Sequence, residues 1–294
     1  GSSHFGSSHL GARISCQTMA KKLRHAQNTW SRNLISDEGL CDAVALVGRD
    51  RVRMPFIGAL VANISVPLRK ALFGNFREGN NREIELTQVD PATFKCILRS
   101  AAHLHPELTA EIVVPTLVAA KLYMIGELED ECYRYMRDKL KPCDCLVVLS
   151  AAESLGEALP EHLHRKLWVS IILKSTSVVT AASFVQAHGA ILCQLLQLDE
   201  LDVAEEQLWS SLFRWVAAVT LADVERLGPL RDAIPELPDG ACAKRRRVEE
   251  LEAGESGTSV TLEPHQQAIL QRLSKHVRFL AMSKEFFGIM SGRT

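Results

Sequence analysis

The spacing of apolar residues changes once along this chain, and that change limits the folds it can adopt. Three short segments before residue 90, at 43–47, 52–54 and 83–86, are apolar runs or alternate with polar residues. Such segments, bounded by polar turns, are typical of β-strands. After residue 90 the apolar residues recur only at three- and four-residue intervals, the period of a helix packed on one side. The sequence therefore predicts a small mixed domain followed by helices alone.

The mixed region predicts a strand hairpin and then helices. Residues 43–47 form an apolar run, Gly48-Arg49-Asp50 is a polar turn, and Val52 and Met54 alternate with arginines. Residues 58–74 place their apolar side chains on one side of a helix. Pro67 interrupts this segment because proline lacks the backbone N–H that a helix interior uses. It therefore marks a break or the start of a new helix.

Helices fill the rest of the chain. Asp90 and Pro91 supply an N-cap and a first helical position for a helix that continues to residue 98. Two helices are expected in tandem over residues 114–124 and 128–140. Helical spacing then recurs without any strand pattern in four segments: residues 146–152, 159–173, 191–198 and 208–219. The second half is expected to be all-helical.

Three segments depart from these patterns. Residues 1–10 are small, polar and repetitive, and we interpret them as a leader outside the fold. Residues 19–35 predict an amphipathic helix that leads into the first domain. Residues 236–264 combine prolines, glycines and a charged block, which indicates a disordered insertion. Apolar periodicity resumes at Ile269 and Leu273, so the insertion should lie inside the helical domain and not at its end.

Composition is that of an ordinary globular protein. The chain has 294 residues, 47% apolar and 23% charged, enough for two domains with separate cores. The formal net charge is −1, so no overall positive field would bring the protein to nucleic acid or to an anionic membrane. No apolar run reaches the roughly 18 residues of a membrane-spanning helix. We expect a soluble protein with neither nucleic acid nor membrane as partner.

The eight cysteines favour a reduced, cytoplasmic compartment. They stand alone except for Cys143 and Cys145, and no signal-type segment precedes them. A structural zinc site usually needs two close ligand pairs, and the second pair is missing, so we predict free thiols and no metal site. The sequence also lacks a phosphate-binding glycine loop, a Gly-x-Ser-x-Gly turn, a His-Glu-x-x-His helix and the kinase signatures. No catalytic residues and no cofactor are therefore predicted.

Four blocks, in order, resemble the BTB/POZ domain. Residues 40–48 (Leu-Cys-Asp-Ala-Val-Ala-Leu-Val-Gly) are similar to its opening strand, and residues 65–74 to the helix that ends in a Phe-Gly step. Residues 83–94 resemble its third strand and the following helix, and residues 119–132 its last helix pair. The resemblance implies an α+β domain over residues 36–140, with a small sheet flanked by helices, after the leader and helix of residues 1–35.

The helical half resembles the BACK domain that often follows BTB. The similar blocks are residues 198–206, residues 212–215 (Leu-Phe-Arg-Trp) and residues 276–283, the last displaced by the insertion. The resemblance implies an all-α BACK domain over residues 141–294. The Glu-Ile-Glu-Leu block at 83–86 and the Arg-Phe block look most like BTB-BACK proteins that usually add a β-sandwich. We expect neither that sandwich nor a kelch propeller within these residues.

The resemblance implies a non-catalytic adaptor that dimerises through BTB, binds the N-terminal region of cullin-3 and brings a protein substrate to a ubiquitin ligase. Cullin-binding BTB domains carry an apolar residue, any residue and Glu after the Phe-Gly step, where this chain has Phe76, Arg77 and Glu78. Tyr123 matches a second cullin-contacting position. Alternatively, Phe76 packs against its own domain and Tyr123 belongs to the core. The alternative function is an assembly scaffold or transcriptional adaptor without cullin binding.

The expected dimer centre departs from the family pattern. The family usually has a His-Arg or His-Lys pair where this chain has Ile57-Gly58, and that basic residue balances an aspartate at the position of Asp42. Removing one member of a buried charged pair costs about 3–5 kcal/mol. Three interpretations are open: Arg51 or Arg53 compensates Asp42, the dimer centre is rearranged, or Asp42 is a half-exposed residue at the start of a strand.

A basic block, Lys244, Arg245, Arg246 and Arg247, lies in the expected insertion. Four cations in a flexible segment are easily bound by an acidic groove, which favours nuclear localisation. The glutamates that follow at 249, 250 and 252 dilute this charge, which favours a solvated loop. Both interpretations are open, beside the cytoplasmic location that the cysteines favour.

Overall fold

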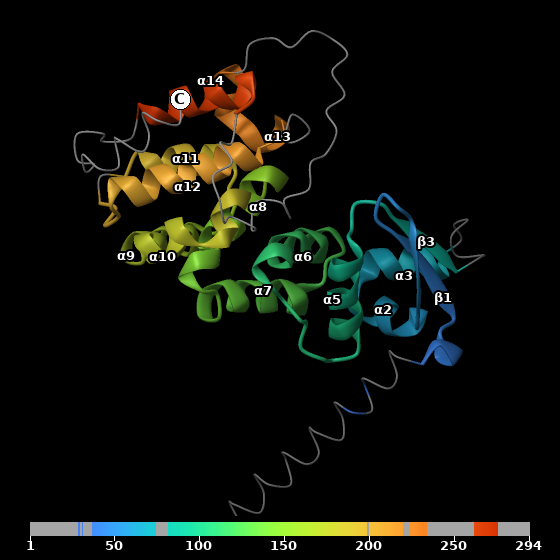
Figure 1. Ribbon diagram of the computed structural model, residues 1–294. Helices are drawn as coiled ribbons and strands as arrows, with labels where there is room; N and C mark the ends of the chain where they lie inside the picture. Colours follow the sequence, from blue (N-terminus) through green and yellow to red (C-terminus); the bar gives the residue numbers. More distant parts are fainter. Residues whose placement is uncertain are drawn as a thin grey trace, which may run out of the picture. The chain divides into compact units, whose positions relative to one another are not determined.

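The computed structural model describes residues 29, 31, 37–74, 82–198, 200–219, 224–233 and 262–275. The chain divides into two compact units, Gly1–Tyr133 and Arg134–Thr294, whose elements are labelled in Figure 1. The expected leader, almost all of the expected helix at 19–35, and nearly all of the expected insertion at 236–264 lie outside the described residues.

A three-stranded mixed sheet with the order β2-β1-β3 lies in the first unit. Strand β1 (Ala43–Val47) pairs antiparallel with β2 (Val52–Phe56) and parallel with β3 (Glu83–Leu86). In the turn from β1 to β2, Gly48 and Arg51 take left-handed backbone conformations, and Arg51 N donates to Gly48 O. The predicted hairpin and its polar turn are confirmed.

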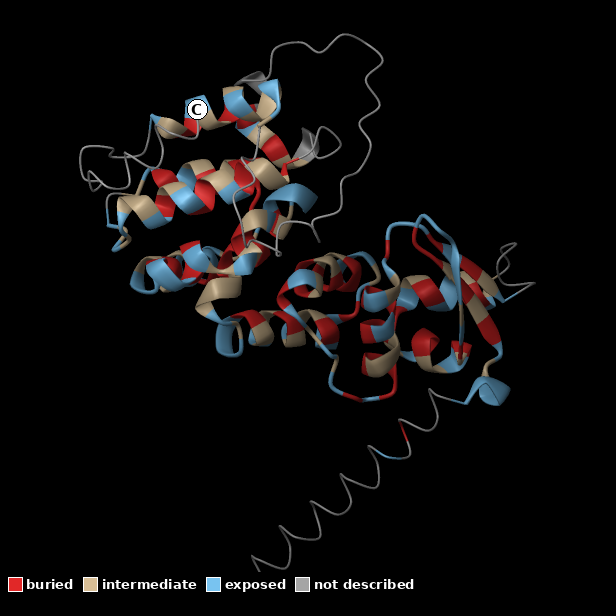
Figure 2. Cartoon of the chain, in the orientation of Figure 1, coloured by how far each residue is buried: buried red, intermediate tan, exposed pale blue. Residues whose placement is uncertain are grey.

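One face of the sheet is buried against helices. Alternate residues of β1 and β3 point to this face, as the two-residue period of a strand requires. The register places Ala45 beside Ile84 and Val47 beside Leu86, so their side chains form one apolar layer. Figure 2 marks the buried positions in red. The opposite face carries half-buried Leu46 and exposed Glu85, so only one side of the sheet contributes to the core.

The described residues place five helices with this sheet: α2 (Gly58–Ile64), α3 (Val66–Phe73), α5 (Pro91–Ala101), α6 (Ala110–Leu122) and α7 (Gly126–Asp138), with a short 3-10 turn η1 (Glu38–Leu40) before β1. The break expected at Pro67 is confirmed, because α3 begins one residue before it. Pro91 starts α5 as expected, but the side chain of Asp90 makes no capping hydrogen bond. Helix α6 begins at Ala110, earlier than residue 114, and contains Pro115 in its interior.

An aromatic pair joins the sheet to α5. The rings of Phe56 and Phe94 meet edge to face, with centroids 5.5 Å apart and planes at 86°. Such a pair adds about 0.5–1.5 kcal/mol beyond the burial of its surface. Both side chains are almost fully buried, so the pair fixes where α5 crosses the sheet.

The described residues of the second unit form helices and turns without a strand. Its helices are α8 (Cys145–Leu155), α9 (Glu161–Leu173), α10 (Ser175–Thr180), α11 (Gly189–Leu196), α12 (Glu205–Ala218), α13 (Val224–Leu227) and α14 (Pro264–Ser274), with 3-10 turns η2 (Pro142–Asp144), η3 (Ala182–Gln186) and η5 (Gly228–Ala233). The expected helical half is confirmed. Helices α10 and α13 were not predicted, because one or two turns give too few residues for a period to be recognised.

Trp215 lies at the centre of the helical core. Its side chain is fully buried, and its indole N–H donates to Ala187 O at 2.9 Å. Arg226 Nε donates to the same carbonyl at 3.2 Å, and its guanidinium lies 5.8 Å from the centre of the indole ring. Helix α12 is thereby fixed both to the segment before α11 and to α13.

Helix α14 packs against α12, although the two are far apart in sequence. Ile269 and Leu273 are fully buried. Gln266 Nε2 donates to Ala217 O at 3.3 Å and to Val219 O at 3.1 Å, carbonyls at the end of α12. Ile269 and Leu273, where the sequence predicts that apolar periodicity resumes, therefore pack in the same helical core as α12. The next expected positions of this pattern, at 277 and 280, lie outside the described residues.

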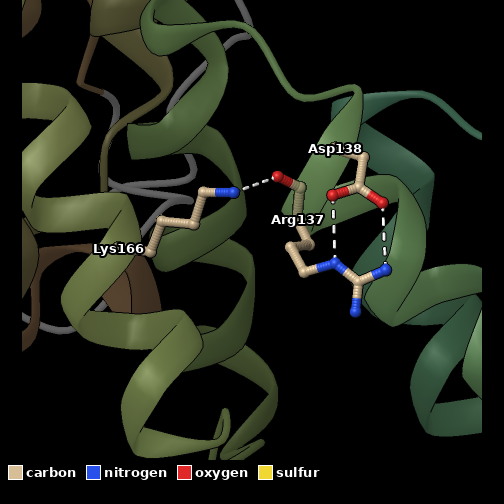
Figure 3. Close-up of polar contacts among 3 residues, drawn as sticks. All are labelled: Arg137, Asp138 and Lys166. Atoms are coloured by element: carbon tan, nitrogen blue, oxygen red, sulfur yellow. Dashed lines mark hydrogen bonds and ion pairs between the residues drawn. The ribbon is translucent and has the colours of Figure 1, made fainter.

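A lysine of α9 holds the last turn of α7 within the second unit. Lys166 Nζ donates to the backbone oxygen of Arg137 (Figure 3). The side chain of Arg137 turns instead to its neighbour Asp138, with two hydrogen bonds of 3.0 Å. These bonds lower the pKa of the Asp138 carboxyl.

Among the described helices, none combines the length and apolar character needed to cross a bilayer.

Candidate functional site

The N-terminal end of α3 is tied to the C-terminal end of α6 by Ser65. The Ser65 hydroxyl accepts from Leu68 N at 3.2 Å, which caps α3, and donates to Tyr123 O at 2.7 Å. Ser65 is completely buried; its bond with Leu68 N is buried and its bond with Tyr123 O is part-buried. Buried hydroxyls need such partners, and here one side chain both starts a helix and holds the end of another.

In the turn after α6, the side chain of Met124 points outward between half-buried Tyr123 and buried Ile125. Tyr123 N donates to Ala119 O, Ile125 N donates to Ala120 O, and Met124 between them has φ +55°. This is the pattern of a helix end that normally carries glycine at the left-handed position. A methionine there carries a backbone cost of roughly 1–2 kcal/mol. Its side chain is 70% exposed, so packing does not repay that cost within the described residues.

Exposed apolar side chains gather around this junction. Val66 follows Ser65 and is 50% exposed; Leu122 and Met124 flank Tyr123 and are 50% and 70% exposed. Tyr123 is half-buried and packs on the domain core, and burial raises the pKa of its hydroxyl. We call Val66, Leu122, Tyr123 and Met124 the α3/α6 surface. Adjacent exposed apolar residues on a rigid frame are a common feature of protein-binding sites.

Of the expected cullin contacts, Tyr123 is the one that lies in the described residues. Tyr123 lies beside the N-terminal end, whereas Phe76 and Glu78 follow the C-terminal end and lie outside the described residues. Helix α3 has eight residues, so its ends are about 12 Å apart.

A second cluster surrounds Asp42. Its Oδ1 accepts from Gly58 N at 2.7 Å, and its Oδ2 lies 2.6 Å from Arg82 Nη1. The Arg82 guanidinium also lies 5.7 Å from the ring centre of Phe73, the last residue of α3. The Asp42 carboxylate thus caps the first turn of α2, where a negative charge is favoured, and is balanced by a cation.

Gly58 makes room for this arrangement. A β-carbon at residue 58 would lie 3.3 Å from Ala43 Cβ and 3.4 Å from Asp42 Oδ1. Glycine at this position therefore lets the Asp42 carboxylate approach the first turn of α2 without these close contacts. Neither Arg51 nor Arg53 compensates Asp42: the partner is Arg82, and Arg51 pairs with Glu85.

Some of these residues could have been found from the sequence. Ser65 directly before Val-Pro matches a helix N-cap followed by proline in the first turn. Arg82 gave no signal, because its partner is 40 residues away. Met124 gave none either, since a left-handed conformation is not expected for methionine.

Comparison with known proteins now decides the family of the first unit. Residues 32–140 match the family model described as the BTB/POZ domain. The chain contains a BTB/POZ domain. This domain is a protein-interaction fold, and the three-stranded mixed sheet with flanking helices agrees with the predicted architecture.

Relatives extend the similarity beyond the BTB domain. Kelch repeat and BTB domain-containing protein 8 of Xenopus tropicalis is 27% identical over 157 residues, 53% of this chain and 25% of the relative. Kelch-like protein 28 of Mus musculus is 28% identical over 179 residues, 60% of this chain and 30% of the relative. BTB/POZ domain-containing protein 6-A of Danio rerio is 25% identical over 187 residues, 63% of this chain and 34% of the relative.

These matches are longer than residues 32–140, so they include part of the helical region. The chain is related at low identity to Kelch-like and BTB/POZ domain-containing proteins of the BTB-BACK type. It spans about a quarter to a third of the length of the relatives named above.

The six described cysteines are free thiols. Burial raises the pKa of Cys132 and of Cys145 to about 12. In the part of the chain that the structure describes, no three His, Cys, Asp or Glu side chains gather as metal ligands would.

The basic block at Lys244, Arg245, Arg246 and Arg247 lies outside the described residues, so its two interpretations stay open.

Proposed function

We propose that this protein is a non-catalytic adaptor that binds the N-terminal region of cullin-3 through its BTB domain and recruits a protein substrate for ubiquitination. Its relatives include Kelch-like proteins, and the resemblance of residues 65–78 to cullin-binding BTB domains supports this role. The free thiols support a reducing compartment, the cytoplasm or the nucleus.

The observation that carries the proposal is the α3/α6 surface. Three large apolar side chains are at least half exposed there, and the Ser65–Tyr123 hydrogen bond joins the turn that carries two of them to the start of α3. A rigid apolar patch binds a partner without a large ordering cost. In the sequence, Phe76 and Glu78 follow α3, which ends at Phe73.

The test is calorimetric titration of the chain with the N-terminal region of cullin-3. An aromatic anchor in a desolvated pocket is the usual energetic centre of an interface, so Phe76→Ala should cost about 2–4 kcal/mol, roughly thirty-fold to nearly a thousand-fold in affinity. Glu78→Lys should weaken binding with a stronger dependence on salt. Val52→Ala, which shortens an exposed apolar residue on β2, is the matched control and should bind as the wild type does.

Two results would contradict the adaptor proposal: absence of binding by the wild type, or equal binding by Phe76→Ala. Either would favour the alternative of an assembly scaffold or transcriptional adaptor without cullin binding.

We also propose that the BTB domain forms a homodimer through the region of η1 and β1 that contains Asp42. Leu40 in η1 is 51% exposed, beside the start of β1, and a symmetric contact would cover it. The wild type should be dimeric by light scattering at tens of micromolar, where an interface of ordinary size holds. Leu40→Asp should shift it to monomer. A wild type that is monomeric at this concentration contradicts the dimer.

A further inference from the structure

Met124 is the most exposed of the methionines that the structure describes. Its side chain is 70% exposed, whereas Met54 is half-buried against the core of the first unit and Met136 is 2% exposed. A dissolved oxidant must reach the thioether sulfur of a methionine before it can react with it. Of the three, Met124 is therefore the one that such an oxidant reaches most readily.

The backbone on both sides of Met124 holds this residue at the surface. Met124 has φ +55° and lies between Tyr123 N, which donates to Ala119 O at 2.9 Å, and Ile125 N, which donates to Ala120 O at 2.8 Å. The side chain of Ile125 is buried, and that of Tyr123 packs on the domain core. Both neighbours are thus anchored, and the methionine between them faces solvent.

Oxidation converts this apolar side chain into a polar one. The sulfur lone pair attacks an oxygen of a hydroperoxide, the O–O bond breaks, and the sulfur–oxygen bond of methionine sulfoxide forms. With hydrogen peroxide, the sulfur is oxidised by two electrons, and the departing hydroxide takes up the proton of the attacked oxygen and leaves as water. The sulfoxide oxygen accepts hydrogen bonds from water, so covering it with an apolar partner surface is costly.

The added oxygen would leave the fold of the domain intact. It is attached near the exposed end of the side chain, and the two hydrogen bonds that flank Met124 join backbone atoms alone. Met136 differs, because an oxygen added in the core would be taken out of water. Oxidation at Met124 therefore changes the surface without changing the core.

The position of Met124 couples this chemistry to binding. It belongs to the α3/α6 surface with Val66 and Leu122, whose aliphatic side chains contain no sulfur and are each 50% exposed. We propose that Met124 is a redox modification site, at which oxidation to the sulfoxide by a hydroperoxide weakens binding of a partner to the α3/α6 surface and reduction of the sulfoxide restores it. This inference rests on the proposed cullin-3 adaptor function, which supplies the partner.

The first measurement follows the modification itself. The full chain is treated with hydrogen peroxide and then with dithiothreitol, which reduces any disulfides formed by its cysteines. Mass spectrometry of proteolytic peptides follows the addition of one oxygen to each methionine. Met124 should be oxidised faster than Met54 and Met136, and oxidation of Met124 that is no faster than theirs overturns the proposal.

The second measurement is calorimetric titration with the N-terminal region of cullin-3. The oxidised chain should bind about five-fold more weakly than the reduced chain, the loss expected for one apolar contact of an interface. Treatment with the two methionine sulfoxide reductases, one for each sulfoxide epimer, should restore the affinity. The thermal unfolding curves of the oxidised and reduced chains should coincide, because the modified side chain lies outside the core.

Met124→Leu is the matched control, since leucine is apolar and of similar size but has no sulfur. It should bind as the wild type does and keep its affinity after the same peroxide treatment, whereas oxidation of any other residue would weaken both proteins alike. Equal affinity of the reduced and oxidised wild type, or an equal loss in Met124→Leu, overturns the proposal. Absence of binding by the reduced wild type would instead contradict the adaptor function.

Discussion

Asp42 Oδ2 lies 2.6 Å from Nη1 of Arg82, 40 residues later in the chain, so the cation that balances this carboxylate comes from the turn before β3. The other oxygen of Asp42 accepts from the backbone of Gly58 at the first turn of α2. The side chains of Asp42 and Arg82 are 37% and 49% exposed, so water screens their attraction. The bond to the helix end should therefore contribute more than the ion pair.

This ranking gives a first prediction. Asp42→Ala removes both interactions and should lower the free energy of unfolding by about 1–2 kcal/mol, the usual loss for a helix cap plus a weak pair. Asp42→Asn keeps an acceptor for Gly58 N and should cost less than Asp42→Ala. Arg82→Gln should cost under about 1 kcal/mol. Urea denaturation of the single and double variants gives the coupling energy, and a coupling well above 1 kcal/mol would mean that the ion pair dominates.

A second prediction concerns the attachment of α14. Gln266 uses its amide nitrogen on two carbonyls at the end of α12 and its amide oxygen on Glu263 N. Gln266→Ala removes three hydrogen bonds and should destabilise the second unit by about 2 kcal/mol. Gln267→Ala is the matched control, because Gln267 makes one exposed bond to Leu262 O. Equal thermal shifts for the two variants would show that α14 is held by Ile269 and Leu273 alone.

The sequence predicted the elements whose signals are local. The hairpin, the break at Pro67 and the return of the core pattern at Ile269 each depend on residues a few positions apart, where period and turn chemistry are sufficient. The start of α6 was placed too late, since Pro115 lies inside that helix and not in its first turn.

The candidate sites depend on contacts between distant residues, and these were mostly missed. Arg82 meets Asp42, and Ser65 meets Tyr123, only after the sheet and helices have assembled. Tyr123 was chosen by resemblance, and the exposure of its neighbour Met124 could not be derived from the sequence. The proposed contacts Phe76 and Glu78 stay predictions, as they lie outside the described residues.

A third prediction concerns Lys166, whose ammonium group holds the backbone oxygen of Arg137 at the end of α7 (Figure 3). Lys166→Met keeps the aliphatic stem but removes the donor, so the free energy of unfolding should fall by about 0.5–1 kcal/mol. Arg137→Ala leaves the carbonyl in place and should have a smaller effect than Lys166→Met. Lys174→Met, an exposed lysine after α9, is the control in thermal unfolding. A loss no larger than that of the control contradicts a capping role.

A fourth prediction follows from the buried thiols. In the unfolded chain a thiol ionises near pH 9, whereas burial raises the pKa of Cys132 and Cys145 to about 12. Between these values the unfolded state binds fewer protons, so the free energy of unfolding falls as pH rises, by up to about 1.4 kcal/mol per pH unit for each thiol. Urea denaturation from about pH 8 to 10 should show a shallower fall for Cys132→Ala, while Val148→Ala, a buried control without a titrating group, keeps the wild-type slope.

The last prediction separates binding from folding at the α3/α6 surface and assumes the proposed cullin-3 adaptor function. Met124 combines a left-handed backbone with a side chain that is 70% exposed. Asparagine tolerates that backbone better than methionine does, so Met124→Asn should leave the thermal stability unchanged or slightly higher. The same change removes an apolar contact and should weaken cullin-3 binding by about 1 kcal/mol, or roughly five-fold, in calorimetric titration.

The matched control for Met124→Asn is Leu155→Asn, which replaces another exposed apolar side chain, in the second unit, with the same polar residue. It should bind cullin-3 as the wild type does. If Met124→Asn also binds with wild-type affinity while Phe76→Ala does not, the partner contacts the C-terminal end of α3 and leaves the α3/α6 surface uncovered. That outcome would limit the contact on α3 to one end of a helix that is about 12 Å long.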